Sequence, residues 1–174
     1  MLTKLWLVGG GGHGVACIDA VESSGLFDIQ GILEHPTYTA EECQGYPVLW
    51  QDENLLGALA VSRNFLIAVG HVGKPENRRT IWESLNEIGA RFPRVFASSS
   101  RVSPRAIVSD GSIVMHAAAV NAQAEVGLNS IINTAAVVEH GVQVGDHCHL
   151  APGAIVNGDA LVGDGAFIGS GAVV

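Results

Sequence analysis

Residues 144–174 read VGDHCHLAPGAIVNGDALVGDGAFIGSGAVV, and the spacing of residue types in this stretch extends back to Arg101. From Val102 onward, every sixth residue is a branched aliphatic. Neither an α-helix nor an alternating strand has a period of six, whereas a coil of short parallel strands does, with one aliphatic side chain pointing inward on each face. These aliphatic positions are Val102, Val108, Val114, Val120, Val126, Ile132, Val138, Val144, Leu150, Val156, Val162, Ile168 and Val174.

A small residue follows each aliphatic by four places and fits the corner between two faces of such a coil. Three faces of six residues make a coil of eighteen, so residues eighteen apart stack at the inter-strand spacing of ~4.8 Å. The stretch holds about four coils and therefore predicts a parallel β-helix. Val142 is the one bulkier member of the corner set, which is Ala106, Ser112, Ala118, Ala124, Ser130, Ala136, Val142, Cys148, Ala154, Ala160, Ala166 and Ala172.

The first part of the chain alternates between strand-like and helix-like patterns. Pro36, Gly45 and Pro47 predict a loop around Tyr46. Apolar runs predict strands at 4–8, 29–33, 65–69 and 94–97, and amphipathic spacing predicts helices at 15–24, 53–61 and 75–88. This alternation indicates a small Rossmann-like parallel sheet with helices on its faces, about half of a dinucleotide-binding fold. The change to period six predicts two domains, 1–97 and 98–174.

Charge and cysteine content limit the class of protein. The formal net charge of −8 argues against nucleic acid or an anionic membrane as the main partner. No apolar run is long enough for a signal peptide core or a membrane span. Cys17, Cys43 and Cys148 form no CxxC pair and are interpreted as free thiols in a reducing compartment. We therefore expect a cytoplasmic protein that neither binds nucleic acid nor inserts into a membrane.

A glycine-rich loop joins the first predicted strand to the first predicted helix. Gly9, Gly11 and Gly14 satisfy G-x-G-x-x-G, in which missing Cβ atoms let backbone amides and a helix N-terminus approach phosphate oxygens. Glu34 ends the second predicted strand, where a ribose-binding acid would stand. A nucleotide-containing ligand, a redox dinucleotide and a merely tight turn all remain open, although the domain is short for two mononucleotide halves.

The spacing of two histidines on the predicted coil determines whether they can meet within one chain. His140 and His149 are nine residues apart, which is half a coil, so they lie on opposite sides of the prism. They meet only if a second copy of the chain brings its His149 to this His140, which motivates a cleft between subunits of a trimer. A solvated surface histidine is the alternative at either position. The pair His147-x-His149 lacks a third ligand other than Asp146, which disfavours a metal site.

Four segments together resemble a known family. They are GGGGHG (9–14), IAVG (67–70), INTAAVVEH (132–140) and HLAPGAIVNGDALVGDGAFIGSGAVV (149–174). In order and spacing they resemble the sialic-acid and bacillosamine type of sugar O/N-acetyltransferases, a branch of the hexapeptide-repeat transferases. The resemblance implies a left-handed β-helix, a homotrimer, acetyl-CoA as co-substrate, no metal, and a nucleotide-linked (UDP-type) amino-sugar as acceptor, for surface polysaccharide or glycan synthesis.

The resemblance also implies roles for individual residues. His140 would be the general base, His149 would contact the acetyl group or support the oxyanion, and Asn133 would line the same cleft. Gly158 and Ser170, with His149, would contact the acetyl-CoA. The residues that would hold the nucleotide-sugar are Gly12, His13, Gly14, Glu34, His35, Gly70 and His71.

Two departures from the family pattern leave alternatives open. Many members have an acid directly after the catalytic histidine, where this chain has Gly141. Members also continue with further coils beyond the point that corresponds to Val174, so the β-helix is expected to be truncated. The alternatives are O-acetylation of a sialic acid or another sugar, and a non-catalytic family member that binds a nucleotide-sugar.

Overall fold

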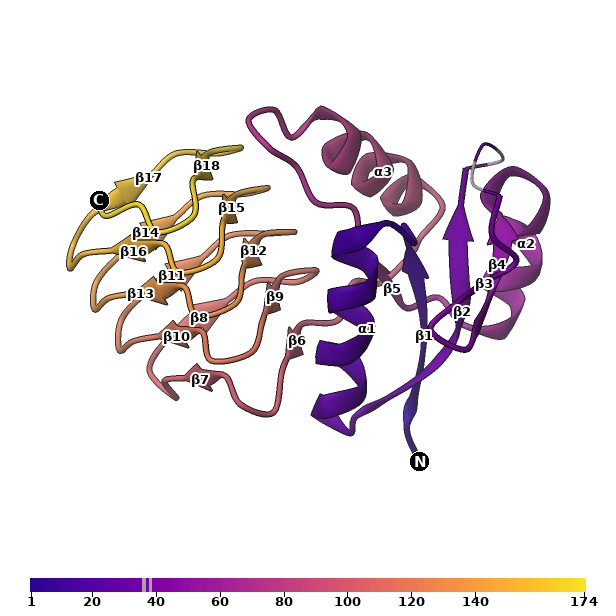
Figure 1. The fold of residues 1–174 in the computed structure, drawn as a ribbon, viewed down its shortest axis with the longest axis horizontal. Coiled ribbons are helices and arrows are strands. Elements are labelled where there is room, and N and C mark those ends of the chain that lie inside the picture. Colours follow the sequence, from indigo (N-terminus) through magenta and orange to yellow (C-terminus); the bar gives the residue numbers. More distant parts are fainter. Residues whose placement is uncertain (36, 38) are drawn as a thin grey trace.

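The computed structural model describes residues 1–35, 37 and 39–174, so Pro36 of the predicted loop lies outside the described residues. An α/β unit comes first and a triangular coil of short strands follows it, with the carboxyl terminus on the side of the coil away from the α/β unit (Figure 1). No helix in the described residues is long and apolar enough to cross a membrane.

The α/β unit contains a five-stranded sheet in the order β3-β4-β2-β1-β5. All neighbouring strands are parallel except β3 and β4, which form an antiparallel hairpin. The elements are β1 (Thr3–Val8), α1 (Gly12–Ser24), β2 (Phe27–Glu34), β3 (Glu42–Cys43), β4 (Tyr46–Trp50), α2 (Gln51–Val61), β5 (Phe65–Ile67) and α3 (Glu76–Glu87). The predicted strands at 4–8, 29–33 and 65–69 and the three predicted helices are therefore confirmed to within a few residues.

The predicted loop around Tyr46 is wrong, because Tyr46 begins β4. Strand β4 pairs in parallel with β2, with Val48 opposite Ile32. Gln44 and Gly45 have φ angles of 52° and 85°, the left-handed conformation that closes a tight hairpin between two strands. The glycine thus marks a two-residue turn within the sheet rather than a longer loop.

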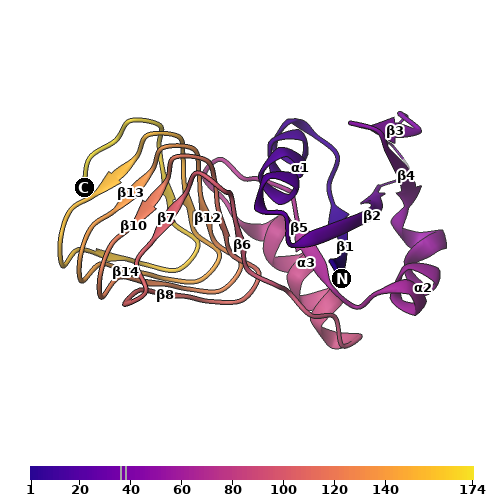
Figure 2. The same ribbon diagram turned by 90° about the horizontal axis from the view of Figure 1, so that it is seen from below.

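Helices cover both faces of this sheet because its strands carry apolar side chains on both faces. On β1, Leu5 and Leu7 pack with α1, whereas Trp6 and Val8 pack with α2 and α3. Helix α1 lies between the sheet and the coil (Figure 2). The core around α1 continues into the coil through Ile113, Met115 and Ile131, so the two units share a buried interface.

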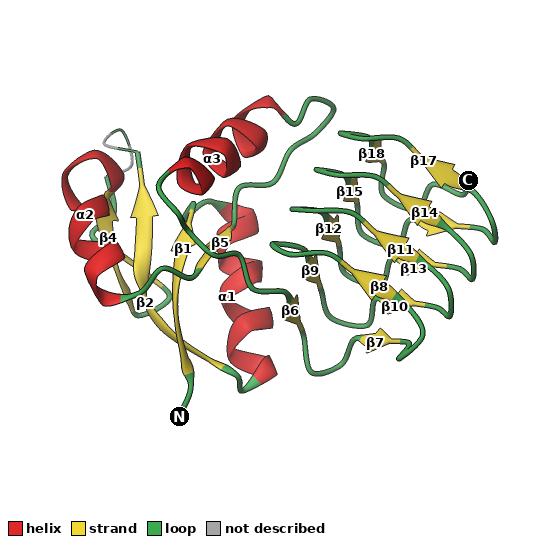
Figure 3. Ribbon diagram, turned by 180° about the vertical axis from the view of Figure 1, so that it is seen from behind, coloured by secondary structure: helices red, strands yellow, loops and turns green. Residues whose placement is uncertain are grey.

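The coil is a left-handed parallel β-helix built as predicted. Residues eighteen apart pair between successive turns, as Ala119 does with Val137 and Glu125 with Gln143. Its turns stack into three sheets of four, four and five strands, which confirms the expected number of coils (Figure 3). The inward aliphatic residues from Val102 to Ile168 form one continuous core with the small apolar corner residues between them, whereas Val174 is 48% exposed.

Each strand of the coil has two residues. The strands are β6 (Val95–Phe96), β7 (Arg101–Val102), β8 (Ile107–Val108), β9 (Ile113–Val114), β10 (Ala119–Val120), β11 (Glu125–Val126), β12 (Ile131–Ile132), β13 (Val137–Val138), β14 (Gln143–Val144), β15 (His149–Leu150), β16 (Ile155–Val156), β17 (Leu161–Val162) and β18 (Phe167–Ile168).

The strand predicted at 94–97 exists as β6, but it does not belong to the α/β sheet. Val95 and Phe96 pair with Ile113 and Val114 of β9, so β6 is the first strand of the coil. Phe96 stands six residues before Val102 and takes the inward position. The domain boundary at 97–98 remains a prediction, and the pairing of β6 favours a slightly earlier one.

Every corner of the coil from the one after β8 onward contains one residue in the left-handed conformation. These residues again recur every six positions, with φ between 51° and 73°. Glycine adopts this conformation without a steric cost, and Asn and Asp tolerate it better than most residues do. The set is Gly111, Ala117, Gln123, Asn129, Ala135, Gly141, His147, Gly153, Asp159, Gly165 and Gly171.

Candidate active site

A pocket of about 800 Å³ lies between the α/β unit and the coil. The carboxyl ends of β1, β2 and β5 meet at one edge of the sheet, and the segments that follow these strands form one wall. The corner after β12 and the face of β15 form the other wall. The lining residues are Gly9, Gly11, Gly12, His13, Ala16, Glu34, Ala68, Val69, Gly70, His71, Val72, Asn133, Thr134, His149 and Pro152.

The glycine loop brings the N-terminus of α1 to this pocket. Helix α1 has no side-chain cap and no acid in its first turn, so the positive end of its dipole is open to an anion. A Cβ on Gly14 would lie 2.3 Å from the carbonyl oxygen of Gly9, so Gly14 allows the helix to pack under the loop. Gly14 itself does not line the pocket.

Glu34 lies at the end of β2 as predicted, but both of its carboxylate oxygens accept hydrogen bonds from the chain. Oε2 accepts from the amide of Gly10 and Oε1 from the amide of His35. Glu34 therefore holds the glycine loop in place. His35 is exposed and lines an adjoining hollow of about 450 Å³, together with Asn77 and Thr80 of α3.

His149 is buried because α1 and the β5–α3 segment cover the outer face of its strand. The residues stacked in register with it on this face include Ile113, Ile131 and Phe167, which are all apolar. Only 7% of His149 is exposed. The alternative of a solvated surface histidine is therefore wrong at this position.

The hydrogen bonds of His149 define its tautomer. Its Nδ1 lies 2.7 Å from the carbonyl oxygen of His71, which can only accept, so Nδ1 carries the proton. Its Nε2 lies 3.0 Å from Nδ2 of Asn133. The amide of Asn133 is oriented by its Oδ1, which accepts from the backbone amide of Thr134 at 2.7 Å. Nε2 of His149 therefore accepts a hydrogen bond from Asn133, and the second N–H of that amide is left for a ligand.

Three of the residues that line the pocket are histidines whose imidazole rings lie close together. The rings of His13 and His71 lie 5.9 Å and 5.4 Å from that of His149. Burial, followed by the charge of Arg78 and the neighbouring histidines, lowers the pKa of His13 to about 3. Burial, His149 and Arg78 lower the pKa of His71 to about 4, and burial also lowers the pKa of His149. All three imidazoles are uncharged at neutral pH.

The remaining predicted residues lie outside this pocket. His140 is exposed at the corner between β13 and β14, on a different side of the prism from His149. Gly158 stacks on it one coil further along, and a Cβ on Gly158 would lie 2.6 Å from Cε1 of His140. Ser170 is exposed two coils beyond Thr134, on the same corner of the prism.

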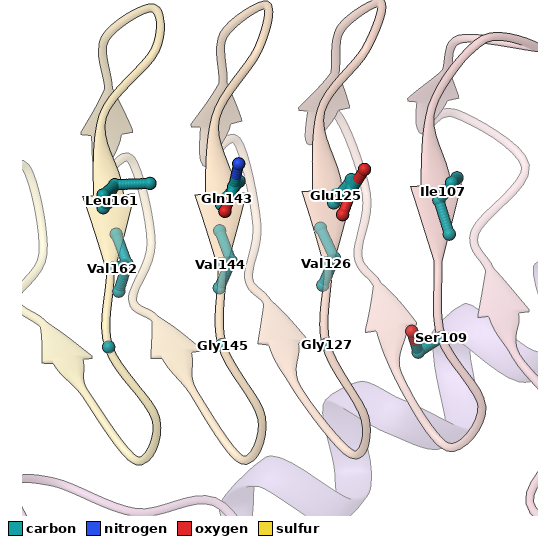
Figure 4. Close-up of a pocket in the computed structure, with 11 residues that line it drawn as sticks. Ile107, Ser109, Glu125, Val126, Gly127, Gln143, Val144, Gly145, Leu161 and Val162 are labelled. Atoms are coloured by element: carbon teal, nitrogen blue, oxygen red, sulfur yellow. The ribbon is translucent and has the colours of Figure 1, made fainter.

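A smaller hollow of about 350 Å³ runs along the outer face of β8, β11, β14 and β17. The side chains of Ile107, Glu125, Gln143 and Leu161 follow one another there from coil to coil (Figure 4). None of the residues predicted to bind substrate or acetyl-CoA lines this hollow. Among the residues that the structure describes, no group of three His, Cys, Asp or Glu side chains is arranged to hold a metal ion.

Comparison with known proteins supports one family for the whole chain. Residues 4–85 match the PglD N-terminal domain, and residues 141–174 match the bacterial transferase hexapeptide repeats. The acetyltransferase domain of PglB from Neisseria gonorrhoeae FA1090, in complex with acetyl coenzyme A, is 30% identical to this chain with a TM-score of 0.85. That match covers 99% of this chain and 82% of the PglB chain. The chain belongs to the PglD-type sugar acetyltransferases.

Two further structures share the fold of this sugar acetyltransferase. A mutant of perosamine N-acetyltransferase from Caulobacter crescentus, in complex with CoA and GDP-perosamine, is 24% identical with a TM-score of 0.85, covering 100% of this chain and 89% of that one. WeeI from Acinetobacter baumannii AYE is 18% identical with a TM-score of 0.70, covering 99% and 94%. At these identities the likeness concerns the fold alone. No curated protein sequence matches the chain.

Sequence reasoning missed one buried residue that lies beside this candidate site. Arg78 of α3 is fully buried between the α/β unit and the coil. Its Nε donates to the carbonyl oxygen of Asn129 at 2.9 Å, and its Nη1 donates to the carbonyl oxygens of Ile67 and Val69. The sequence feature that could have revealed Arg78 is its spacing. It stands three residues before Ile81, on the apolar face of the predicted helix at 75–88.

Proposed function

We propose that this protein transfers the acetyl group of acetyl-CoA to the amine of a nucleotide-linked amino-sugar. The observation that carries the proposal is the pocket, in which the open N-terminus of α1 and the His149–Asn133 pair of the coil face one cavity. A helix N-terminus suits a diphosphate, and an amide donor suits a developing oxyanion. The relative that is 30% identical binds acetyl coenzyme A, which supports the same donor here.

The nucleotide-sugar is assigned to the wall formed by the α/β unit. Gly12 and His13 at the start of α1 would meet the diphosphate, and Gly70 and His71 after β5 would flank the sugar. The pocket and the adjoining hollow share Gly9, Glu34 and Val69, so the nucleoside has room to extend toward His35. Both UDP-linked and GDP-linked acceptors remain candidates for this wall.

The reaction moves one proton from the amine nitrogen to the thiolate sulfur and needs no redox partner. The amine nitrogen attacks the thioester carbonyl, a tetrahedral intermediate forms, and the C–S bond breaks to release CoA. His140 takes the proton from the attacking nitrogen and returns it to the departing thiolate, as a general base and then a general acid. The free N–H of Asn133 would stabilise the oxyanion. Gly158 and Ser170 are both exposed on the coil, and Gly158 adjoins His140, so they are positioned to hold acetyl-CoA.

The proposed active form is a homotrimer whose sites lie between copies. His140 lies on a different corner of the prism from the pocket of its own chain, so it would serve the pocket of a neighbour. The face of β8, β11, β14 and β17 adjoins that corner and carries exposed apolar side chains. Ile107 is 59% exposed and Leu161 is 73% exposed, which fits contact with a second copy. The three free, buried cysteines fit a reducing cytoplasm.

The first experiment measures CoA release by the purified protein with acetyl-CoA and a panel of acceptors. The panel contains UDP-linked and GDP-linked 4-amino-sugars and free sialic acid. We expect turnover with a nucleotide-linked amino-sugar, and a loss of about 10²–10⁴-fold in the His140→Ala variant. His116→Gln, at a histidine away from the pocket, serves as the control and should retain activity. Turnover of sialic acid alone would replace amine transfer by O-acetylation, and no turnover by a folded trimer would indicate a binding protein.

Subunit mixing tests the shared site directly. His140→Ala keeps an intact pocket but lacks the base, whereas Asn133→Ala keeps the base but has a defective pocket. If the base of one copy serves the pocket of the next, trimers reassembled from equal amounts of both variants regain about a quarter of the wild-type sites. If both residues act within one chain, the mixture stays inactive.

A further inference from the structure

The Arg78 guanidinium is a buried cation without a counterion. Among the described residues, the ion pairs are those of Arg94 and His116, and neither involves Arg78. Its Nη2 has no hydrogen-bond partner, and its other nitrogens bond only to backbone carbonyls. Burying an unpaired charge carries a large desolvation cost, so a methionine or leucine would suit a purely structural role better.

The three carbonyls that Arg78 contacts come from both halves of the molecule. Ile67 is the last residue of β5, Val69 follows it by two places, and Asn129 is a corner residue of the coil. The segment after β5 then continues directly into the pocket wall as Val69, Gly70 and His71. Arg78 therefore fixes this wall of the pocket to the coil.

From this wall the contacts continue to the proposed reacting groups. The carbonyl of His71 accepts the Nδ1 proton of His149, and Nε2 of His149 accepts from Asn133. A shift of the segment after β5 would break the first of these bonds. His149 would then be free to take the other tautomer, in which Nε2 carries the proton and repels the N–H of Asn133.

We propose that Arg78 is a positioning residue for acetyl transfer, which ties the segment after β5 to the coil and thereby maintains the His71–His149–Asn133 arrangement. The inference rests on the proposed function for its catalytic consequence, and on the structure alone for the arrangement itself.

The charge of Arg78 adds a second effect that an apolar residue would not supply. It contributes to the lowered pKa values of His13, His71 and His149, and it places positive potential behind a pocket assigned to a diphosphate. The same positive potential disfavours protonation of the acceptor's amine, and the uncharged amine is the form that attacks a thioester. The titratable groups that face Arg78 are His13 and Cys17 from α1, His71 after β5, and His147 and His149 from the coil.

Three variants separate the positioning role from a general loss of charge. Arg78→Met removes the guanidinium, Arg78→Lys keeps a charge but not the forked donors, and Arg79→Met removes a neighbouring charge that is only partly buried. We expect kcat/KM to fall roughly 100-fold in Arg78→Met, as for other misplaced reacting groups. Arg78→Lys should fall between Arg78→Met and the wild type, and Arg79→Met should match the wild type.

A readout independent of turnover is the tautomer of His149, measured by nitrogen-15 NMR of labelled histidine. We expect the Nδ1-protonated form in the wild type and a mixture of tautomers in Arg78→Lys, with thermal unfolding as a check that the variant is folded. If Arg78→Met does not fold, Arg78→Lys alone decides the question through the same two readouts. A folded Arg78 variant with wild-type activity and tautomer overturns the proposal, as does an Nε2-protonated His149 in the wild type. An inactive wild type would refute the proposed function while leaving the NMR measurement to decide the role of Arg78.

Discussion

The carboxylate of Asp159 occupies the space that a side chain on Gly141 would need. A Cβ on Gly141 would lie 2.0 Å from Oδ1 of Asp159, which stands one coil further along. Gly141 also has a φ of 69°, in the left-handed region. The chain has Gly141 where the family resemblance leads one to expect an acid after His140, and a carboxylate from the next coil fills the space of its side chain. An acid introduced at 141 would have to displace Asp159.

We predict that Gly141→Ala costs about 1–2 kcal/mol of folding free energy, mainly because alanine is strained in the left-handed region. Gly153→Ala is the matched control, since Gly153 has the same φ of 69° and no neighbouring atom closer than 3.9 Å to its Cβ position. Urea unfolding should give similar costs for both, because the exposed Asp159 side chain can rotate away. A much larger cost at 141 that Asp159→Ala does not remove would show that the coil itself is displaced.

We predict that Gly158→Ala lowers kcat about 100-fold with little loss of stability. The added methyl would lie 2.6 Å from Cε1 and 2.7 Å from Nε2 of His140, so the exposed ring must move. A displacement of about 1 Å in a reacting group costs roughly 100-fold in rate. The measurement is kcat for acetyl transfer, beside the unfolding midpoint. Gly57→Ala, at a glycine of α2 with no atom within 4 Å of its Cβ position, should retain activity. Full activity of Gly158→Ala would argue against His140 as the base.

The coil was predictable because its core repeats locally. The fold of the coil requires an inward aliphatic and a small corner residue once in every six positions. The pattern from Val102 to Val174 therefore specifies both the strands and the eighteen-residue stacking that the structure shows. The glycine loop and the helices of the α/β unit were predictable for the same reason, since their signals lie within a few residues of one another.

Contacts between the two units were not predictable in this way. On a free β-helix the outward positions face solvent, so the sequence leaves a solvated histidine and a site residue as alternatives for His149. The neighbouring outward positions on the same face are Ile113, Ile131 and Phe167, an apolar series at intervals of eighteen that indicates a covered face. The pattern shows that something covers this face but not what. The partners of Arg78, at Ile67, Val69 and Asn129, are likewise set by tertiary packing, which no local spacing reveals.

We predict that Gly14→Ala destabilises the fold by about 1–3 kcal/mol, in the range of overpacked cores. Its Cβ would lie 2.3 Å from the carbonyl oxygen of Gly9, a backbone atom that cannot rotate away as a side chain can. Gly12→Ala is the control in the same helix turn, because nothing lies within 4 Å of its Cβ position. That change should be neutral or slightly stabilising, since alanine favours a helix over glycine. Equal unfolding midpoints for the two variants would contradict the tight packing of α1 under the loop.

Our last prediction is that the protein loses stability as the pH falls from about 7 to 5. His71 has an ordinary pKa of 6.5 in the unfolded chain, whereas burial, His149 and Arg78 lower it to about 4 in the folded protein, and His13 falls to about 3. Below pH 6.5 the unfolded chain therefore binds protons that the folded protein does not, and the free energy of unfolding decreases. Urea unfolding at pH 7.5, 6 and 5 measures how the free energy of unfolding changes with pH, at pH values above the range where most carboxylates titrate. His71→Gln removes one of these groups, so its slope should be shallower, and measurement at pH 8 corrects for any other effect of the substitution on stability. If the wild type is equally stable at pH 7.5 and 5, or if His71→Gln keeps the full slope, then His71 is not held uncharged beside His149.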